Sequence, residues 1–442
     1  MKHRTVRIGF LAFLLACEPA FGPEDLPGDG DLPARGDLPA LPDVADREDL
    51  PTPRDLPGPD EPDLDDVPDL PPPDVPGDLP EAGPLPDGDF ATPEGIALAD
   101  RYVVVANPSF RYDGQRMVFG TGFLTVVDRG TRQVVQRVAL PCRNPQEVSW
   151  DGIRLWALCS GETSFDGTLV RPAGQAALVG LDRSGTPFRI VSYLPVPQSA
   201  SHPLVGYPSS MVVRDGRAYL GCGTTAALLV ADLDEHRLVR SPEDPWSLAA
   251  LGLSGLEDQD TVKVLPGPPG MLLAGSFNRD LVAAFGVTGE EPVPAGSLEV
   301  GVPGMLDGVL DLAWRPGGTP ELYVLLGLAQ RVVAVSDLLG SPRVDDRFAV
   351  TGTMPNRLLL DRDRLWILDS GDNRATAVDA DTGKPLGLRA AMPPGTNPYA
   401  LAAGDFEGRR ELYVTGLRSD SLWIFDADTG ALLAEVPPGP RS

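Results

Sequence analysis

The sequence predicts an all-β fold, a seven-bladed β-propeller over residues 91–442, preceded by a disordered tether rich in Pro and Asp. Three observations lead to this prediction. Short apolar runs ending in a similar turn recur about every 50 residues, and each recurrence contains four strand-like runs. In addition, no stretch keeps the 3.6-residue periodicity of an amphipathic helix. Seven repeats of a four-stranded sheet describe a propeller in which each sheet is one blade.

The third strand of each unit is the clearest marker of the repeat. Its last residue is an aspartate, or a glycine in the fourth unit, and these residues are Asp128, Asp182, Asp232, Gly286, Asp337, Asp379 and Asp426. Their successive spacings are 54, 50, 54, 51, 42 and 47 residues. An aspartate here can accept backbone N–H groups of the following turn, in which a later glycine adopts left-handed backbone. The regular spacing favours a propeller over two packed β domains.

The second strand of each unit is apolar at consecutive positions, as in residues 155–158 and 365–368. Such a strand is expected to be buried on both faces, as happens where sheets stack against neighbouring sheets. A proline stands at the start of the first strand in five units: Pro93, Pro145, Pro208, Pro355 and Pro398. The last unit is complete in itself, so the sequence leaves the closure of the ring open, and residues 85–91 are a candidate for an added edge strand.

The units resemble the YVTN-type β-propeller repeat, whose pattern is a Tyr-Val strand, a Val-x-Asp strand and a Thr-Gly turn. In the seventh unit Tyr413-Val414, Phe425-Asp426 and Thr429-Gly430 carry this pattern. The sixth unit carries it through Val378-Asp379 and Thr382-Gly383. The other five units share the hydrophobic pattern and, in most, the turn aspartate. The resemblance implies a fold and no particular activity.

Residues 1–16 have the pattern of a secretory signal peptide. Lys2, Arg4 and Arg7 precede an apolar run at 8–16, which is too short to span a bilayer. The sequence Leu14-Leu15-Ala16-Cys17 resembles the lipobox of bacterial lipoproteins, which implies that Cys17 is lipidated and becomes the mature N-terminus. An ordinary signal peptide with a chance cysteine is the alternative. We expect an exported cell-envelope lipoprotein, anchored at the outer membrane or cell surface of a Gram-negative-type bacterium.

Residues 17–90 comprise the lipidated cysteine and a linker of unusual composition. Positions 18–90 contain 19 prolines, 22 acidic residues, three arginines and seven copies of Asp-Leu-Pro. Such a segment has too little apolar surface to offset the entropy of ordering, so we expect it to be disordered and extended. It is interpreted as a stalk that holds the head away from the membrane, or as a linker with no specific role.

The charge and the motifs limit the functions that the predicted propeller, which we call the head, can have. The chain has a formal net charge of −26, of which residues 91–442 contribute −10, and this argues against nucleic-acid binding. No nucleophile elbow, P-loop, dinucleotide fingerprint or His-Glu-x-x-His motif is present. The sequence therefore favours a monomeric, non-enzymatic binding module without a cofactor.

Two long loops support a binding function and indicate where a partner would bind. They follow the second strands of the first two units, span roughly residues 108–122 and 160–175, and carry Phe110, Tyr112, Phe119 and Phe165. Aromatic loops on a rigid scaffold suggest binding of a protein or a glycan. The same loops can instead fold back onto the propeller as plugs.

The alternative function is a channel-metal-dependent hydrolase of the lactonase kind. Segments leading into the first strands converge on one mouth of the propeller channel, and they carry Glu94, Asn144, Asp260, Asp307, Asn356 and Asn397. A ring of carboxylate and amide oxygens suits Ca²⁺ or Mg²⁺. Asp and Asn also cap strand starts in turns without binding any metal, which is the other interpretation.

Three cysteines follow Cys17. Cys142 precedes the first strand of the second unit and Cys159 ends its second strand, so a hairpin between these strands brings the two together. Cys222 occupies in the third unit the place of Cys159, which makes Cys159–Cys222 a rival disulfide. Export permits either bond. A metal site formed by the three cysteines has no supporting Cys-x-x-Cys motif or neighbouring histidine.

Overall fold

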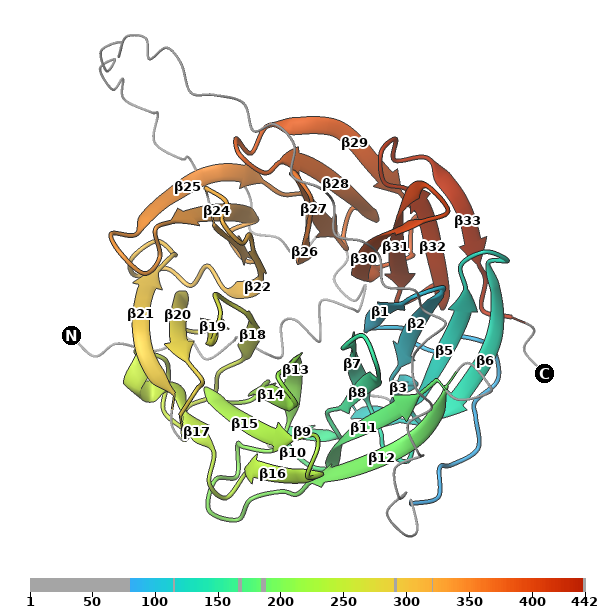
Figure 1. Ribbon diagram of the computed structural model, residues 1–442, viewed down its shortest axis with the longest axis horizontal. Helices are drawn as coiled ribbons and strands as arrows, with labels where there is room; N and C mark the ends of the chain where they lie inside the picture. Colours follow the sequence, from blue (N-terminus) through green and yellow to red (C-terminus); the bar gives the residue numbers. More distant parts are fainter. Residues whose placement is uncertain are drawn as a thin grey trace, which may run out of the picture. The chain divides into compact units, whose positions relative to one another are not determined.

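The computed structural model describes residues 80–113, 116–165, 169–183, 188–289, 292–319 and 321–439. These residues form seven antiparallel sheets arranged as blades around a common centre (Figure 1). The predicted seven-bladed β-propeller is therefore confirmed. Within the described residues, helix is limited to one short 3₁₀ turn, η2 (Leu248–Leu251). The predicted signal peptide, Cys17 and the tether up to residue 79 lie outside the described residues.

Each blade runs from an inner strand at the ring centre to an outer strand at the rim (Figure 1). Blade 1 consists of β1 (Ile96–Ala99), β2 (Tyr102–Asn107), β5 (Phe123–Asp128) and β6 (Gln133–Ala139). Blade 2 consists of β7 (Pro145–Trp150), β8 (Leu155–Cys159), β11 (Ala176–Asp182) and β12 (Arg189–Val196). Blade 3 consists of β13 (Pro208–Arg214), β14 (Arg217–Cys222), β15 (Ala227–Asp232) and β16 (Arg237–Arg240), and the short β17 (Trp246–Ser247) also pairs with β15.

The remaining blades follow the same order. Blade 4 consists of β18 (Val262–Pro266), β19 (Met271–Ser276), β20 (Leu281–Gly286) and β21 (Val293–Glu299). Blade 5 consists of β22 (Val309–Trp314), β23 (Leu322–Leu326), β24 (Arg331–Ser336) and β25 (Arg343–Val350). Blade 6 consists of β26 (Pro355–Asp361), β27 (Arg364–Asp369), β28 (Arg374–Asp379) and β29 (Pro385–Ala391). Blade 7 consists of β30 (Pro398–Phe406), β31 (Arg409–Gly416), β32 (Ser421–Asp426) and β33 (Leu432–Val436).

The hydrophobic core is divided into seven layers, each formed by the facing sides of two neighbouring blades. Along β8, for example, Leu155 and Ala157 belong to the layer shared with blade 1, whereas Trp156 and Leu158 belong to the layer shared with blade 3. Successive residues of a strand point to opposite faces, so a strand between two such layers is apolar at every position. This explains the continuous apolar runs of the second strands and confirms that both of their faces are buried.

The aspartates that end the third strands perform the predicted role in their turns. The Oδ1 atom of Asp426 accepts hydrogen bonds from the backbone N–H groups of Asp428 (3.1 Å) and Thr429 (2.9 Å). Asp379 does the same for its own turn. The glycines that follow, Gly383 and Gly430, have φ angles of 67° and 73°, the left-handed region that glycine adopts without strain.

The propeller has two distinct faces. Because strands alternate in direction, the segments leading into the inner strands share one face with the turns between second and third strands; we call this the top face. The two long loops of the top face form β-hairpins, β3 (Phe110–Asp113) with β4 (Arg116–Phe119) on blade 1, and β9 (Thr163–Phe165) with β10 (Val170–Pro172) on blade 2. They fold back only in part: Phe119 is buried and Phe165 is half-exposed.

No strand is shared between blade 7 and blade 1, so the ring closes through side chains and the segment before β1. Residues 85–91 contain no strand, and the candidate edge strand was wrong; instead, the backbone N–H of Asp89 donates to Pro438 O. Phe90 is buried in the apolar layer between the two blades. Arg129 of blade 1 donates to Tyr413 Oη of blade 7 (2.8 Å) and to Gly404 O (3.0 Å).

A disulfide joins Cys142 to Cys159 and fastens the inner hairpin of blade 2, where their Cα atoms lie 6.1 Å apart. Cys222 is a buried free thiol in blade 3. Burial raises the pKa of this thiol to about 12, so it stays protonated and unreactive at neutral pH. The rival pairing of Cys159 with Cys222 is not formed.

Candidate functional site

The inner strands position side chains at the ring centre through a recurring irregularity. In five blades the pairing of the first strand with the second shifts register just after the strand begins, for example between Pro145 and Glu147 in β7 and between Pro355 and Arg357 in β26. A β-bulge of this kind sets two residues against one and redirects their side chains. In these five blades the bulge redirects the side chains of the residues that follow the first residue of the inner strand.

The six residues predicted as a metal ring occupy three different positions relative to the inner strands. Asn144 and Asn397 immediately precede the strand, Glu94 and Asn356 come just after the proline, and Asp260 and Asp307 stand further upstream. Among the described residues no group of three His, Cys, Asp or Glu side chains is placed to hold one metal ion. The structure therefore does not bring the six together as one ligand set, and a channel Ca²⁺ or Mg²⁺ stays a prediction.

Four of the six residues have structural roles in their own loops. Asn144 and Asn397 adopt left-handed backbone, with φ angles of 59° and 49°, which asparagine tolerates better than most residues. The carboxylate of Asp260 accepts hydrogen bonds from Ser276 Oγ (2.6 Å) and two backbone N–H groups. The carboxylate of Asp307 accepts from Val302 N (2.7 Å) and from an arginine.

Some bulge residues join neighbouring inner strands. Ser210 Oγ donates to Val262 O (3.0 Å), Asp311 Oδ2 accepts from Leu358 N (2.8 Å), and Asn356 Nδ2 donates to Tyr399 O (3.1 Å). Each of these bonds crosses from one blade to the next. They hold the inner strands at fixed spacing and so provide a rigid frame around the ring centre.

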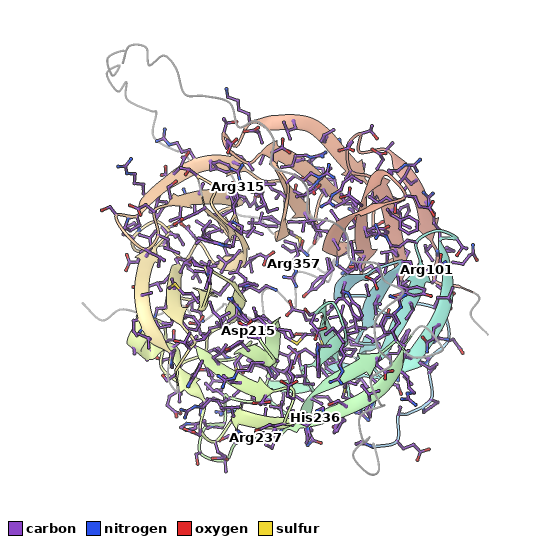
Figure 2. All side chains as sticks on the ribbon, in the orientation of Figure 1. Arg101, Asp215, His236, Arg237, Arg315 and Arg357 are labelled. Atoms are coloured by element: carbon purple, nitrogen blue, oxygen red, sulfur yellow. A yellow bond between two sulfur atoms is a disulfide. The ribbon has the colours of Figure 1, made fainter. Side chains whose placement is uncertain are left out.

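The Arg357 side chain lies at the ring centre (Figure 2). Its guanidinium lies 5.2 Å from the centre of the Tyr399 ring and forms no ion pair within the described part of the chain. Burial lowers the pKa of Arg357, but Tyr399, Asp311, Glu147 and Glu94 raise it, so the group stays charged. Electrostatic contact with residues of blades 1, 2, 5 and 7 places this side chain where the blades converge.

Glu94 faces the same centre from blade 1 and is 6 % exposed. Burial raises the pKa of its carboxyl to about 8, with the charge of Arg357 opposing the rise. At neutral pH this carboxyl is therefore mainly protonated and can donate a hydrogen bond. Its Oε2 atom has no hydrogen-bond partner in the structure.

Tyr207, Lys263 and Glu147 complete the surroundings. Tyr207 Oη accepts hydrogen bonds from Asn144 Nδ2 (3.1 Å) and Gln146 Nε2 (3.0 Å), and burial, with the nearby charge of Glu94, raises its pKa. Lys263 Nζ pairs with Glu147 Oε1 at 3.4 Å, which leaves Glu147 Oε2 without a partner. We call Glu94, Glu147, Lys263, Arg357 and Tyr399 the central cluster.

Buried polar atoms without partners accumulate around the central cluster. Besides the two glutamate oxygens, Asn144 Oδ1 and Asn356 Oδ1 lack hydrogen-bond partners. Buried polar groups in folded proteins are nearly always hydrogen-bonded, to protein or to ordered water. A guanidinium without an ion pair beside several acceptors that have no protein partner can bind a ligand that supplies both an anionic group and hydroxyl donors.

Sequence reasoning found Glu94 and Asn356 but missed Glu147, Lys263 and Arg357. The missed residues all lie one or two positions after the first residue of an inner strand, whereas the prediction mixed residues before and after that point. A search confined to the two residues after each of the prolines Pro93, Pro145, Pro208, Pro355 and Pro398 would have found Glu147 and Arg357. Lys263 follows a valine and has no such marker.

Neither a protein-family model nor a curated protein matches this sequence. Solved structures resemble it in fold. A periplasmic gluconolactonase of Pseudomonas aeruginosa is 18 % identical, with a TM-score of 0.52 over 80 % of this chain and 96 % of that one. A putative 6-phosphogluconolactonase of Bacteroides fragilis is 14 % identical, with a TM-score of 0.53 over 76 % and 96 %. A functionally unknown protein of Desulfotomaculum acetoxidans is 11 % identical, with a TM-score of 0.50 over 71 % and 92 %. At these identities the likeness concerns the fold.

The described residues include no helix that is long and apolar enough to cross a membrane.

Proposed function

We propose that this chain is an exported, lipid-anchored protein of the cell envelope whose propeller head binds a small ligand at the central cluster without converting it. The ligand carries one anionic group, such as a carboxylate, and several hydroxyls. The observation that carries the proposal is Arg357, a charged guanidinium at the ring centre without an ion pair among the described residues, surrounded by unpartnered oxygens.

The ligand chemistry follows from the partners that the cluster lacks. The planar guanidinium of Arg357 has paired N–H donors that match the two oxygens of a carboxylate. Glu147 Oε2 and Asn356 Oδ1 are acceptors and fit hydroxyl donors, while the protonated carboxyl of Glu94 can donate or accept. The ring of Tyr399 adds a flat apolar surface beside the cation. Together these groups favour a polyhydroxy acid over a neutral sugar or a cation.

Replacing Arg357 by Gln is expected to weaken the binding of gluconate, used as a probe, by about 10- to 100-fold, because a hydrogen bond to a charged group contributes roughly 1.5–3 kcal/mol. Titration calorimetry measures the effect, with glucose as the neutral comparison. Arg362→Gln is the matched control, since Arg362 pairs with Asp405 at 2.8 Å on the opposite face of blade 6. Equal binding of gluconate and glucose, or an unchanged affinity of the Arg357 variant, contradicts the proposal.

Replacing Cys17 by Ser is expected to move the protein from the membrane fraction to the soluble periplasmic or extracellular fraction. Several acyl chains on Cys17 hold a protein firmly, since each buried CH₂ contributes about 0.8 kcal/mol. Fractionation of cells expressing both forms, with incorporation of labelled palmitate, measures the change. A membrane fraction that is unchanged in the Ser variant contradicts lipid anchoring at Cys17.

A second candidate function is the hydrolysis of a lactone at the same cluster. The pKa of Glu94, about 8, lies close to the pH at which a general acid or base works best, and Arg357 can stabilise developing negative charge. Two proteins of similar fold are described as lactonases. Hydrolysis of gluconolactone above the spontaneous rate, lost in Glu94→Gln, favours this candidate over simple binding. A metal-dependent form further requires bound Ca²⁺ or Mg²⁺ and a melting temperature lowered by EDTA.

A further inference from the structure

The top face of blades 5 and 6 carries six exposed apolar side chains in three loops. We call them the apolar shelf: Val302, Met305, Leu306, Leu328, Val350 and Met354. Met305 is 66 % exposed and Val350 is 86 % exposed. Exposed apolar groups that occur singly are ordinary, but a contiguous set marks a contact surface.

Backbone hydrogen bonds show that the three loops are neighbours. Leu328 N donates to Asp307 O (2.9 Å), which ties the β23–β24 turn to the loop before β22. Thr351 N donates to Gln330 O (3.1 Å), which ties the segment after β25 to the same turn. The three loops that carry the six side chains are therefore neighbours, over the sector of the ring that contains β22 to β26 (Figure 1).

The apolar shelf is a neutral area on an acidic head. Residues 301–306, 327–330 and 350–354 contain no Asp, Glu, Lys or Arg, although 23 % of the chain is charged. Two heads that each carry a net charge of −10 repel one another over most orientations. This repulsion is weakest when their neutral shelves face each other.

The composition of the apolar shelf also distinguishes a protein surface from a membrane surface. Segments that insert into a bilayer interface are rich in Trp, Tyr, Lys and Arg. The three loops contain none of these four residues and present Val, Leu and Met instead. Methionine adapts its shape to an apolar partner and is common at protein contacts.

We propose that the apolar shelf is a self-association surface and that its occupant is the shelf of a second copy of this chain. The contact is isologous, with each shelf meeting its equivalent across a two-fold axis. Its fifteen loop residues are fewer than the roughly 20–30 residues a side of a standard interface, so the association is weak. The head is thus a monomer in dilute solution and pairs when copies are concentrated.

The rest of the top face permits this arrangement. The β3–β4 and β9–β10 hairpins stand on blades 1 and 2, away from blades 5 and 6 in the ring. Two heads displaced sideways can therefore bring their shelves together without a clash between hairpins. If Cys17 is lipidated as proposed above, anchoring on one membrane raises the effective concentration of copies and favours the pair. The self-association itself does not depend on the ligand at the central cluster.

Sedimentation velocity of the full chain carrying Cys17→Ser tests the proposal at concentrations from about 1 to about 200 µM. The expected result is a sedimentation coefficient that rises with concentration toward that of a dimer. Met305→Glu combined with Val350→Glu is expected to weaken the association more than about tenfold, since it buries charge in the contact. Ile153→Glu is the matched control, because Ile153 is 74 % exposed on the opposite face of blade 2.

Salt provides an independent readout. Added NaCl is expected to strengthen the pairing, because it screens the repulsion between acidic heads and leaves apolar contact intact. A chain that stays monomeric throughout the concentration range overturns the proposal, as does a dimer that Ile153→Glu abolishes and the double variant does not. Binding of the monomer to phosphatidylcholine vesicles through Met305 overturns it in favour of a membrane contact.

Discussion

Replacing Arg129 by Met is expected to lower the free energy of unfolding by about 3 kcal/mol or more, because it removes a buried cation and the three hydrogen bonds that it donates. Arg129 is 5 % exposed and donates to Tyr413 Oη at 2.8 Å, Asp100 O at 3.0 Å and Gly404 O at 3.0 Å. Its guanidinium also lies 4.6 Å from the centre of the Phe406 ring. A single side chain thus holds together the turns of the first and last blades.

The effect at Arg129 is large because the closure of this ring uses no shared strand. Tyr413 Oη donates onward to Glu411, and Arg132 reaches the same carboxylate from blade 1 at 3.5 Å. Removal of Arg129 takes away the hydrogen bonds that it donates to the carbonyls of Asp100 and Gly404 and to Tyr413 Oη. Blades 1 and 7 are otherwise joined by one apolar layer, by the segment before β1 and by Arg132, which also donates to Leu433 O (2.8 Å), so the loss weakens a junction that has no shared strand.

Urea denaturation followed by tryptophan fluorescence measures the change at Arg129. Arg362→Met is the matched control: Arg362 of blade 6 pairs with Asp405, and the side chains of both residues are largely exposed. Exposed ion pairs contribute only about 0–1 kcal/mol to stability, so the free energy of unfolding of this control variant should change little. Equal losses of unfolding free energy in the two variants would show that ring closure does not depend specifically on Arg129.

The fold could be predicted from the sequence because its determinants are local and repeated. The apolar strand at 155–158 is preceded by the Asp151-Gly152 turn and its pattern recurs in every unit, so periodicity alone indicates stacked sheets. The closure could not be predicted, because Arg129 and Tyr413 are 284 residues apart in the chain and no sequence pattern links the two.

The central cluster could be predicted only in part, for a geometric reason. The sequence indicates where an inner strand begins, and that was enough to single out Glu94 and Asn356. Whether the side chain of Arg357 faces the ring centre depends on the register shift between Pro355 and Arg357. The amino-acid composition does not indicate this shift. The electrostatic contact between Glu94 and Arg357 also depends on blades far apart in the sequence meeting at the axis.

Replacing Glu94 by Gln is expected to remove a pH dependence of stability. The pKa of this buried carboxyl is raised to about 8 in the folded protein, whereas an unfolded chain releases the proton near pH 4.5. Between these values the folded protein keeps a proton that the unfolded chain has lost. The free energy of unfolding therefore falls as the pH rises, by about 1.4 kcal/mol per unit at most, and levels off above pH 8.

Comparing the natural protein with the Glu94 variant between pH 6 and pH 8 isolates Glu94, because Asp260, Asp280 and Asp369, whose pKa values burial also raises, are the same in both proteins. Across this window the natural protein should lose about 2 kcal/mol of stability, and Glu94→Gln should lose clearly less. At pH 8 the variant should be the more stable of the two, because an amide carries no charge that burial penalises. Denaturation curves at several pH values measure both effects, with Glu435→Gln, at an exposed position on β33, as the control. Parallel pH profiles of the natural protein and the Glu94 variant would mean that this carboxyl is ionised in the folded state, and the central cluster would then favour a cationic ligand over a polyhydroxy acid.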